Sequence, residues 1–125
     1  MREILFKGKR EDNGEWICGM PCATEQSGIY AIQTLDGAIF DIIPETVGQY
    51  TGLPDINNRK IFEGDIVKSY NAAGKMDGIG VVNWSDLFAS WHISENQSMY
   101  SGCIAFYEII GNVHDNPALL EVNNG

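Results

Sequence analysis

The feature that most restricts the fold is a repeated alternation of apolar and polar residues, interrupted by short turn sequences. Successive side chains of a β-strand point to opposite faces of a sheet, so this alternation is typical of strands with one buried face. No long segment has the three- and four-residue apolar spacing of an amphipathic helix. The sequence therefore predicts a mainly β protein. The first strands are expected over residues 2–9, 15–20, 29–34 and 38–43.

Two dipeptides between these segments predict β-hairpins. Asn13-Gly14 separates the first two expected strands, and Asp36-Gly37 separates the next two. Both pairs tolerate the positive φ that tight hairpin turns require. Asn58 is also expected to be left-handed, because its short polar side chain can hydrogen-bond to the local backbone. We therefore expect an N-terminal lobe of β-hairpins over residues 1–58.

The following residues, 59–125, are predicted to form a second lobe. Gly64-Asp65 precedes an apolar segment, and a sharp bend before a strand is common at the start of SH3-like barrels. By analogy we expect a small SH3-like barrel, integrated with the first lobe into one structural unit. Asn116 followed by Pro117 predicts a short helical turn near the C-terminus, since asparagine caps helices and proline suits their first position.

The charge balance restricts the kind of partner. The chain of 125 residues has 17 acidic residues against 8 Lys and Arg, and its net charge is −9. Proteins bind nucleic-acid backbones mainly through Lys and Arg, so this balance argues against sequence-independent DNA binding. No segment has the ~20 apolar residues of a membrane helix, and no signal-peptide pattern is present, so a soluble cytoplasmic protein is expected. Six basic residues are candidates for a local patch: Arg2, Lys7, Lys9, Arg10, Arg59 and Lys60.

The three cysteines, Cys18, Cys22 and Cys103, are an odd number in a chain large enough to fold without disulfides, so reduced thiols are expected. A zinc site can be constructed from these thiols with His92 or His114. However, three residues separate Cys18 from Cys22, where the tight zinc knuckle has two. No metal and no other cofactor is predicted.

Cys18 has a second interpretation. It alternates with Trp16 and Met20 along one expected strand, so the three side chains share a face of the sheet. A buried cysteine behaves as a small apolar residue. This pattern predicts that Cys18 lies in the core.

No pair or triad of residues predicts catalysis. Glu63 and Asp65 are close in sequence, but Asp65 is better explained as a turn residue that accepts backbone hydrogen bonds. His114 and Asp115 are adjacent, and adjacent residues seldom face each other as a base and its orienting carboxylate do. The G-x-S-x-G motif of many hydrolases is absent. We expect a protein that is not an enzyme.

Aromatic residues are concentrated in the second lobe, and most are expected in its core. Trp84, Trp91 and Tyr100 are the candidates for an interaction surface. An aromatic surface with an acidic rim suits a peptide or a cationic side chain.

Four blocks of the sequence carry a resemblance to a known family. They are M-R-E-I-L-F-K-G-K-R followed by G-E-W in residues 1–16, P-E-T-V-G-Q-Y-T-G-L in 44–53, K-I-F-E-G-D-I-V in 60–67, and I-I-G-N-V with N-P-A-L-L-E in 109–121. In this order they resemble the YopX-like family of phage and prophage proteins. Asn58 stands where the family usually has a glycine, and residues 69–105 carry little of the pattern.

The resemblance implies an all-β fold with a barrel-like C-terminal part, and an origin in a phage or an integrated phage region. It implies no established activity and no catalytic or binding residues. We therefore expect a phage-derived, non-enzymatic protein of the bacterial cytoplasm that binds a protein, either another one or a second copy of itself. The alternative hypothesis is a nucleic-acid-associated phage factor that uses the six basic residues named above.

Overall fold

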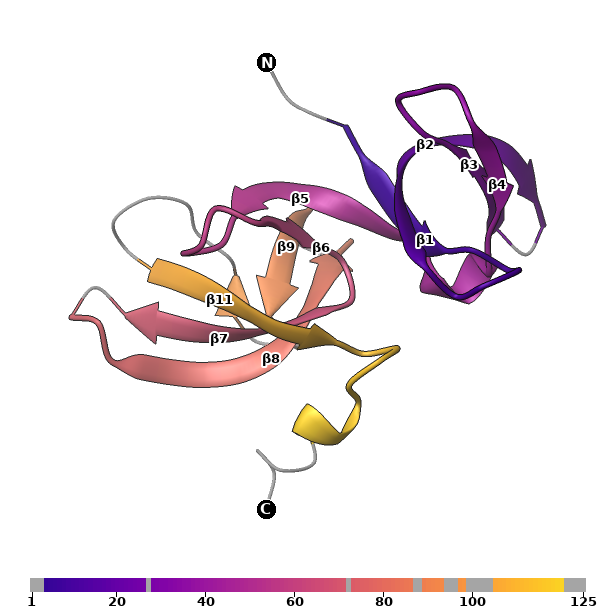
Figure 1. The fold of residues 1–125 in the computed structure, drawn as a ribbon. Coiled ribbons are helices and arrows are strands. Elements are labelled where there is room, and N and C mark those ends of the chain that lie inside the picture. The colour runs from indigo at the N-terminus through magenta and orange to yellow at the C-terminus, as the bar shows by residue number, and fades with distance from the viewer. Residues whose placement is uncertain are drawn as a thin grey trace. The chain divides into compact units, whose positions relative to one another are not determined.

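The computed structural model describes residues 4–26, 28–71, 73–86, 89–93, 97–98 and 105–120. Within these ranges the protein is mainly β, with antiparallel strands and one short helical turn near the C-terminus, as predicted (Figure 1). Contacts divide the chain into two compact units, Met1–Gly52 and Leu53–Gly125. No helix in the described part of the chain is long and apolar enough to cross a membrane.

The first unit contains four strands, one short 3-10 helix and the beginning of a fifth strand. The strands pair antiparallel in the order β4-β3-β2-β1-β5, and β6 follows β5 in the same hydrogen-bonded order. The elements are β1 (Phe6–Lys9), β2 (Trp16–Glu25), β3 (Gly28–Gln33), β4 (Ile39–Asp41), η1 (Pro44–Thr46) and β5 (Gly48–Pro54).

The predicted turns are present. Gly14 and Gly37 have φ of 73° and 93°, and Asn58 has φ of 63°, which confirms the left-handed conformation expected for it. The first hairpin loop is wider than a two-residue turn, because the N–H of Arg10 donates to the carbonyl of Glu15 and leaves the residues between them in the loop.

β2 continues past Pro21, where the sequence predicts a loop, and ends at Glu25. Pro21 pairs with Ile32 of β3, and the register shifts between Pro21 and Ala23. A β-bulge accommodates proline, which has no N–H to donate. The proline therefore marks an irregularity within the strand and not its end.

Hydrogen bonds connect the segment that follows β4 to the end of β1. Arg10 forms an isolated antiparallel bridge with Ile42, and the N–H of Ile43 donates to the carbonyl of Lys9 over 2.9 Å. The sheet formed by β1 to β4 consequently curls strongly, as Figure 1 shows.

The inner face of this curled sheet has no room for side chains at two positions. A Cβ atom at Gly19 would overlap with the carbonyl oxygen of Gln33 and lie 2.8 Å from its carbonyl carbon. A Cβ atom at Gly8 would lie 2.8 Å from the Cδ1 atom of Ile42. Ile32 and Ile42 are buried on this side. Only glycine permits so close an approach of backbone to its neighbours.

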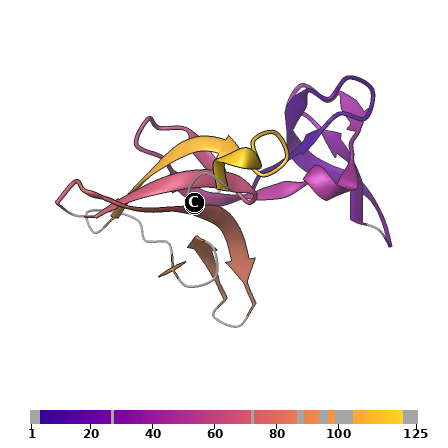
Figure 2. The same ribbon diagram turned by 90° about the horizontal axis from the view of Figure 1, so that it is seen from below.

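The second unit contains the end of β5 and the remaining strands, and its main sheet has the order β10-β9-β8-β7-β11. β8 pairs first with β7 and then with β9, and Figure 2 shows the bend that this change of partner requires. The strands are β6 (Lys60–Phe62), β7 (Asp65–Asn71), β8 (Met76–Ser85), β9 (Ser90–Ile93), β10 (Gln97–Ser98) and β11 (Ala105–Asn112).

The closed SH3-like barrel expected over residues 59–125 is not found. Among the residues that the structure describes, β10 and β11 end the sheet on its two sides and do not pair with each other. Gly64 does make the predicted bend before β7, with φ of 92°. A local bend does not determine which strands pair, and this is why the analogy failed.

The core of the second unit lies on one face of its sheet. Leu53 and two other half-buried residues, Trp91 and Ile109, pack against it. Its buried members are Ile61, Val67, Val82, Ile93 and Tyr107. Leu53 is the first residue of this unit, and it contacts the core.

The buried carboxylate of Asp55 connects the start of this unit to β11. It accepts hydrogen bonds from the backbone N–H groups of Asn57, Arg59 and Ile109, and the Arg59 guanidinium lies 3.2 Å away. The N–H of Ile56 donates to β11 as well. The edge of β11 that does not face β7 would otherwise expose unpaired backbone groups, and these bonds give such groups hydrogen-bond partners.

We predict that Gly19→Ala strongly destabilises the first unit. The added methyl group meets backbone atoms of β3, which cannot move aside as a flexible side chain can. Urea unfolding should show a loss of about 3 kcal/mol or failure to fold. Gly78→Ala is the control, because a Cβ atom there has only an ordinary contact with Ser69 at 3.9 Å. Equal stability of the two variants would contradict the close approach.

We predict that Asp55→Asn destabilises the second unit at neutral pH more than at acidic pH. Burial raises the pKa of the Asp55 carboxyl, but the hydrogen bonds from the backbone of Arg59, Ile109 and Asn57 and the charge of Arg59 outweigh this effect, so the pKa is lowered from its ordinary value. The stabilisation is therefore complete above the unfolded-state pKa and is lost as the pH falls through the folded-state pKa.

Unfolding measured at pH 7 should show a loss of about 2 kcal/mol for Asp55→Asn. The difference from the wild type should shrink as the pH falls below the ordinary pKa of an aspartate, about 3.9. Asp86→Asn, at an exposed position of the same unit, should have little effect at either pH. A loss that is independent of pH would show that the ionised carboxylate does not provide the stabilisation.

Candidate binding surface

The outer face of the first sheet carries the side chains that alternate with the inner glycines. These are Lys7 and Lys9 on β1, and Trp16, Cys18 and Met20 on β2. Lys9 pairs with Trp16, and Lys7 pairs with Cys18. Because directly paired residues point to the same side of a sheet, the five side chains lie on one surface.

Two lysines contact one indole ring on this surface. The Nζ atom of Lys7 lies 4.7 Å from the centroid of the Trp16 ring, and that of Lys9 lies 5.5 Å away. Both distances are within the ~6 Å range of cation–π attraction, which contributes about 0.5–1 kcal/mol at exposed positions. The contacts therefore hold two positive charges beside an aromatic ring.

An apolar part continues the same surface across the next strands. Met20 pairs with Gln33 of β3, and Gln33 pairs with Ile39 of β4. Met20 is 46% exposed and Ile39 is 60% exposed. Large apolar side chains held in water by a rigid sheet are suited to burial against a partner. We call Lys7, Lys9, Trp16, Met20 and Ile39 the outer surface.

The expectation that Cys18 lies in the core is wrong, since Cys18 and Met20 are both exposed. The sequence did contain the necessary signal. Lys7 and Lys9 share the face of Cys18 once the hairpin register is known, whereas the opposite face carries Gly8 and Gly19. Charged residues mark the side in water, and small residues mark the crowded side.

The residues considered for zinc are not brought together. Cys18 and Cys22 are exposed thiols, His92 is buried and His114 is exposed. Cys103 lies outside the described residues. In the described ranges no three His, Cys, Asp or Glu side chains form a group that could hold a metal ion.

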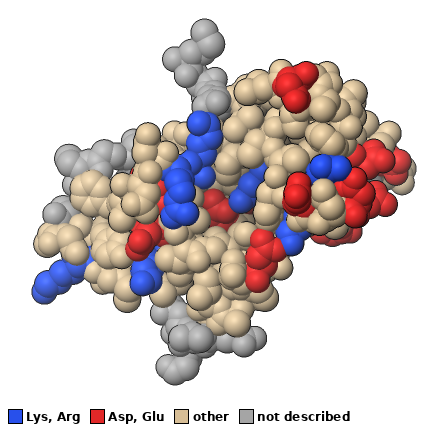
Figure 3. Space-filling model, in the orientation of Figure 1, with Lys and Arg blue, Asp and Glu red and all other residues tan. Residues whose placement is uncertain are grey.

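The predicted basic patch is divided between the two units. Lys7, Lys9 and Arg10 belong to the first unit, and Arg59 and Lys60 belong to the second. Arg2 lies outside the described residues. On the face shown in Figure 3, Lys and Arg atoms form small groups interspersed with acidic ones.

Both described arginines of the patch have structural partners. Arg10 forms an ion pair of 2.6 Å with Asp12, and its guanidinium lies 4.3 Å from the Phe40 ring. The hydrogen bond from Arg10 lowers the pKa of Asp12. Arg59 contacts Asp55 and also donates to the carbonyl of Ile109 over 2.8 Å. Of the described patch residues, Lys7 and Lys9 are therefore the pair that the fold places together on an aromatic ring.

The described residues of the predicted aromatic surface lie at the border of the core of the second unit. Trp84 and Trp91 pair across β8 and β9, and their rings meet edge to face with centroids 5.1 Å apart. Trp91 packs against the core, whereas Trp84 is 40% exposed. Tyr100 lies outside the described residues. The edge-to-face contact gives the pair a packing role.

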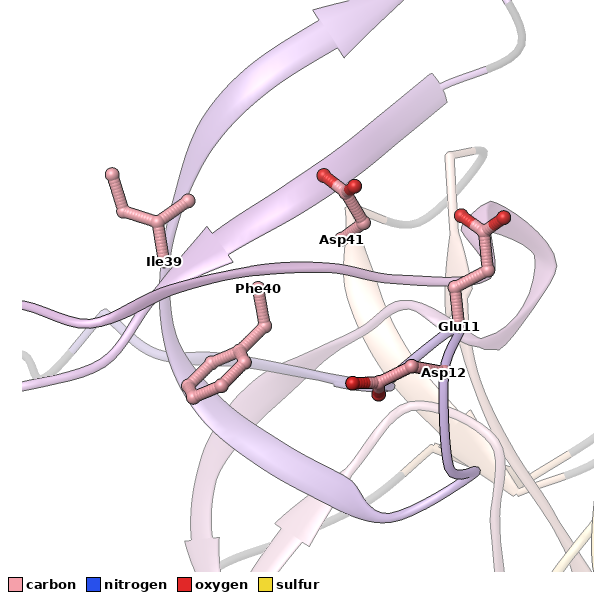
Figure 4. A pocket seen from close by; sticks show the side chains of 5 residues that line it. All are labelled: Glu11, Asp12, Ile39, Phe40 and Asp41. Atoms are coloured by element: carbon pink, nitrogen blue, oxygen red, sulfur yellow. The ribbon is translucent and has the colours of Figure 1, made fainter.

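A recess of about 400 Å³ lies beside the first hairpin loop. Figure 4 shows Ile39 and Asp41 pointing to one side of β4 and Phe40 to the other. The remaining lining residues are Glu11 and Asp12. Asp12 is already paired with Arg10, so the recess is an acidic hollow with part of its charge neutralised.

The sequence matches the model of the YopX protein family over residues 3–121. The chain belongs to this family. Among solved structures, this YopX family protein is similar to the crystal structure of protein EF1440 from Enterococcus faecalis, with a TM-score of 0.63 and 22% sequence identity. The similarity covers 96% of this chain and 99% of that chain, and it shows a shared fold. No curated protein matches the sequence.

The position of Cys18 on the outer face can be tested chemically. We predict that the native YopX family protein reacts rapidly with a thiol reagent, and that Cys18→Ser removes one equivalent of this rapid reaction, because the thiol is exposed. Cys22→Ser is the control and should remove another equivalent. If Cys18→Ser changes only the slow phase seen after unfolding, the strand faces are assigned the wrong way round.

Proposed function

We propose that this YopX family protein is a phage-derived, non-enzymatic protein of the bacterial cytoplasm whose function is to bind another protein through the outer surface. The observation that carries the proposal is the contact of the Trp16 ring with two lysines, on the same face as exposed Met20 and Ile39. Tryptophan is enriched among the residues that dominate binding energy, and methionine is enriched at interfaces.

The geometry of the first sheet supports this use of the surface. Its inner face has no room for a side chain at positions 8 and 19, and the residues next to these glycines, Lys7, Lys9, Cys18 and Met20, are placed on the outer face. Burying a fully exposed side chain of this size contributes about 1.5–3 kcal/mol, and roughly half of this remains to be gained at Met20 and Ile39, which are 46% and 60% exposed. The ordered backbone beneath these residues also limits the entropy lost on association.

The residues considered for acid–base catalysis have partners that support a structural role. The buried carboxylate of Asp65 accepts a hydrogen bond of 2.8 Å from the N–H of Phe62, which is the turn role predicted for it. Asp55, which the sequence did not suggest for catalysis, is a second buried carboxylate, and three backbone N–H groups hold it. Groups held in this way stabilise turns and strand edges, which agrees with a non-enzymatic function.

Binding of single-stranded nucleic acid is the second candidate. Trp16 with Lys7 and Lys9 resembles the aromatic and cationic elements on which bases stack and phosphates bind. The net charge of −9 opposes it, because a polyanion is repelled by the rest of the chain. We therefore favour the protein partner.

The test is affinity capture, in which the protein and its matched variants are used to retain partners from bacterial cells that carry the phage DNA encoding it. The partner retained by the wild type is identified, purified and titrated by calorimetry. We predict that the double variant Met20→Asp with Ile39→Asp weakens its binding at least about tenfold, since buried carboxylates would replace apolar contacts. Leu35→Asp is the control, because Leu35 is 97% exposed in a hairpin loop.

Nuclease treatment before capture separates the two candidates. Retention that survives nuclease and is lost only in the double variant supports a protein partner. Retention that nuclease abolishes would favour the nucleic acid, and equal binding by both aspartate variants would exclude the outer surface. Recovery of a second copy of the chain would identify the partner as the protein itself.

A further inference from the structure

The two lysines of the outer surface have a spacing that a ligand can match. Lys7 and Lys9 are alternate residues of β1, so their backbone positions are about 6.8 Å apart along the strand. Both ammonium groups contact the same Trp16 ring. The surface therefore offers two lysine side chains that leave β1 at the repeat distance of an extended chain.

Resting on the protein-binding function proposed above, we infer that the outer surface recognises an extended acidic segment of the partner, with carboxylates at two alternate residues followed by an apolar residue. Side chains of an extended segment point to the same side at every second residue. Two such carboxylates can each meet one lysine, while the segment's backbone lies over the indole ring between them.

The register of β1 and β2 determines which residue follows the two carboxylates. Lys9 lies opposite Trp16, and Lys7 lies opposite Cys18. Met20 is two residues beyond Cys18 on the same face of β2 and is exposed. A segment that runs antiparallel to β1, in the direction of β2, therefore meets Lys9, then Lys7, then the apolar part at Met20. In steps of two residues, the matching ligand pattern is Glu-x-Glu-x-Leu.

Charges beside the surface favour a short acidic segment over a nucleic acid. Glu15 is exposed next to Trp16, and Glu11 and Asp12 are exposed in the same hairpin loop. At physiological salt these charges act over roughly 8 Å. A nucleic acid that extends beyond the two lysines at this end brings further phosphates toward these charges, whereas a segment with two carboxylates brings only its first one near them.

The inference can be tested with synthetic peptides and the full chain. The first probe is a peptide with blocked, uncharged termini that contains Glu-Ser-Glu-Ser-Leu. The second probe is the same peptide with both Glu residues replaced by Lys. We expect the first peptide to bind with an affinity that falls as salt rises, and the second not to bind. Both are followed by NMR through the indole N–H signal of Trp16.

The most decisive comparison uses a variant in which the charges of the two lysines are reversed. The double variant Lys7→Glu with Lys9→Glu should bind the Glu peptide at least about tenfold more weakly than the wild type and should bind the Lys peptide. General unfolding cannot produce this new binding. Lys68→Glu with Lys75→Glu makes the same change of net charge in the second unit and should leave binding of the Glu peptide unchanged.

Three outcomes would overturn the inference. They are a thymidine pentanucleotide that binds more tightly than the Glu peptide, a Glu peptide that binds both double variants equally, and the absence of any peptide binding. If the last occurs while the captured partner still depends on Met20 and Ile39, the acidic segment is excluded and the protein-binding function stands. If that dependence fails too, both proposals fail.

Discussion

The close approach of backbone and side chains on the inner face of the first sheet determines the rest of this unit. At Gly19 a methyl group would overlap with the backbone of β3, and at Gly8 it would press against Ile42. Because the strands alternate, residues on either side of these glycines must point outward. The lysines, Trp16 and Met20 therefore lie on the outer face, and the proposed binding surface depends on the same constraint.

The second unit is held by a different interaction. The carboxylate of Asp55 gathers three backbone N–H groups and the charge of Arg59, and through Ile109 it fixes the loop after β5 to the edge of β11. Ionised carboxylates with several backbone donors form strong hydrogen bonds. In this account the second unit provides a stable sheet with protected edges, and the first unit provides the contact with a partner.

Several elements could be predicted from the sequence because local chemistry specifies them. The turn residues Gly14, Gly37 and Asn58 have the positive φ that their residue types favour, and the helical turn follows Asn116 and Pro117. The family could also be recognised, since its blocks run through most of the chain. The closed barrel was not predictable in this way, because strand pairing across the second unit depends on contacts between distant residues.

The candidate surface was only partly accessible to sequence reasoning. Lys7 and Lys9 were recognised as basic residues, but Cys18, which shares a face with Trp16, was assigned to the core, because alternation shows which residues share a face and not which face is buried. Pairing the strands across the Asn13-Gly14 hairpin places the lysines beside Trp16 and the glycines behind them. The register was thus the missing piece of information.

The most direct test of this account is an NMR measurement of what surrounds the Trp16 ring in the free protein. We predict nuclear Overhauser contacts from the indole protons to the side-chain methylene groups of Lys7 and Lys9, together with upfield ring-current shifts of those methylene protons. Contacts from the indole to the methyl groups of Ile32 and Ile42 would place Trp16 on the inner face and contradict the account.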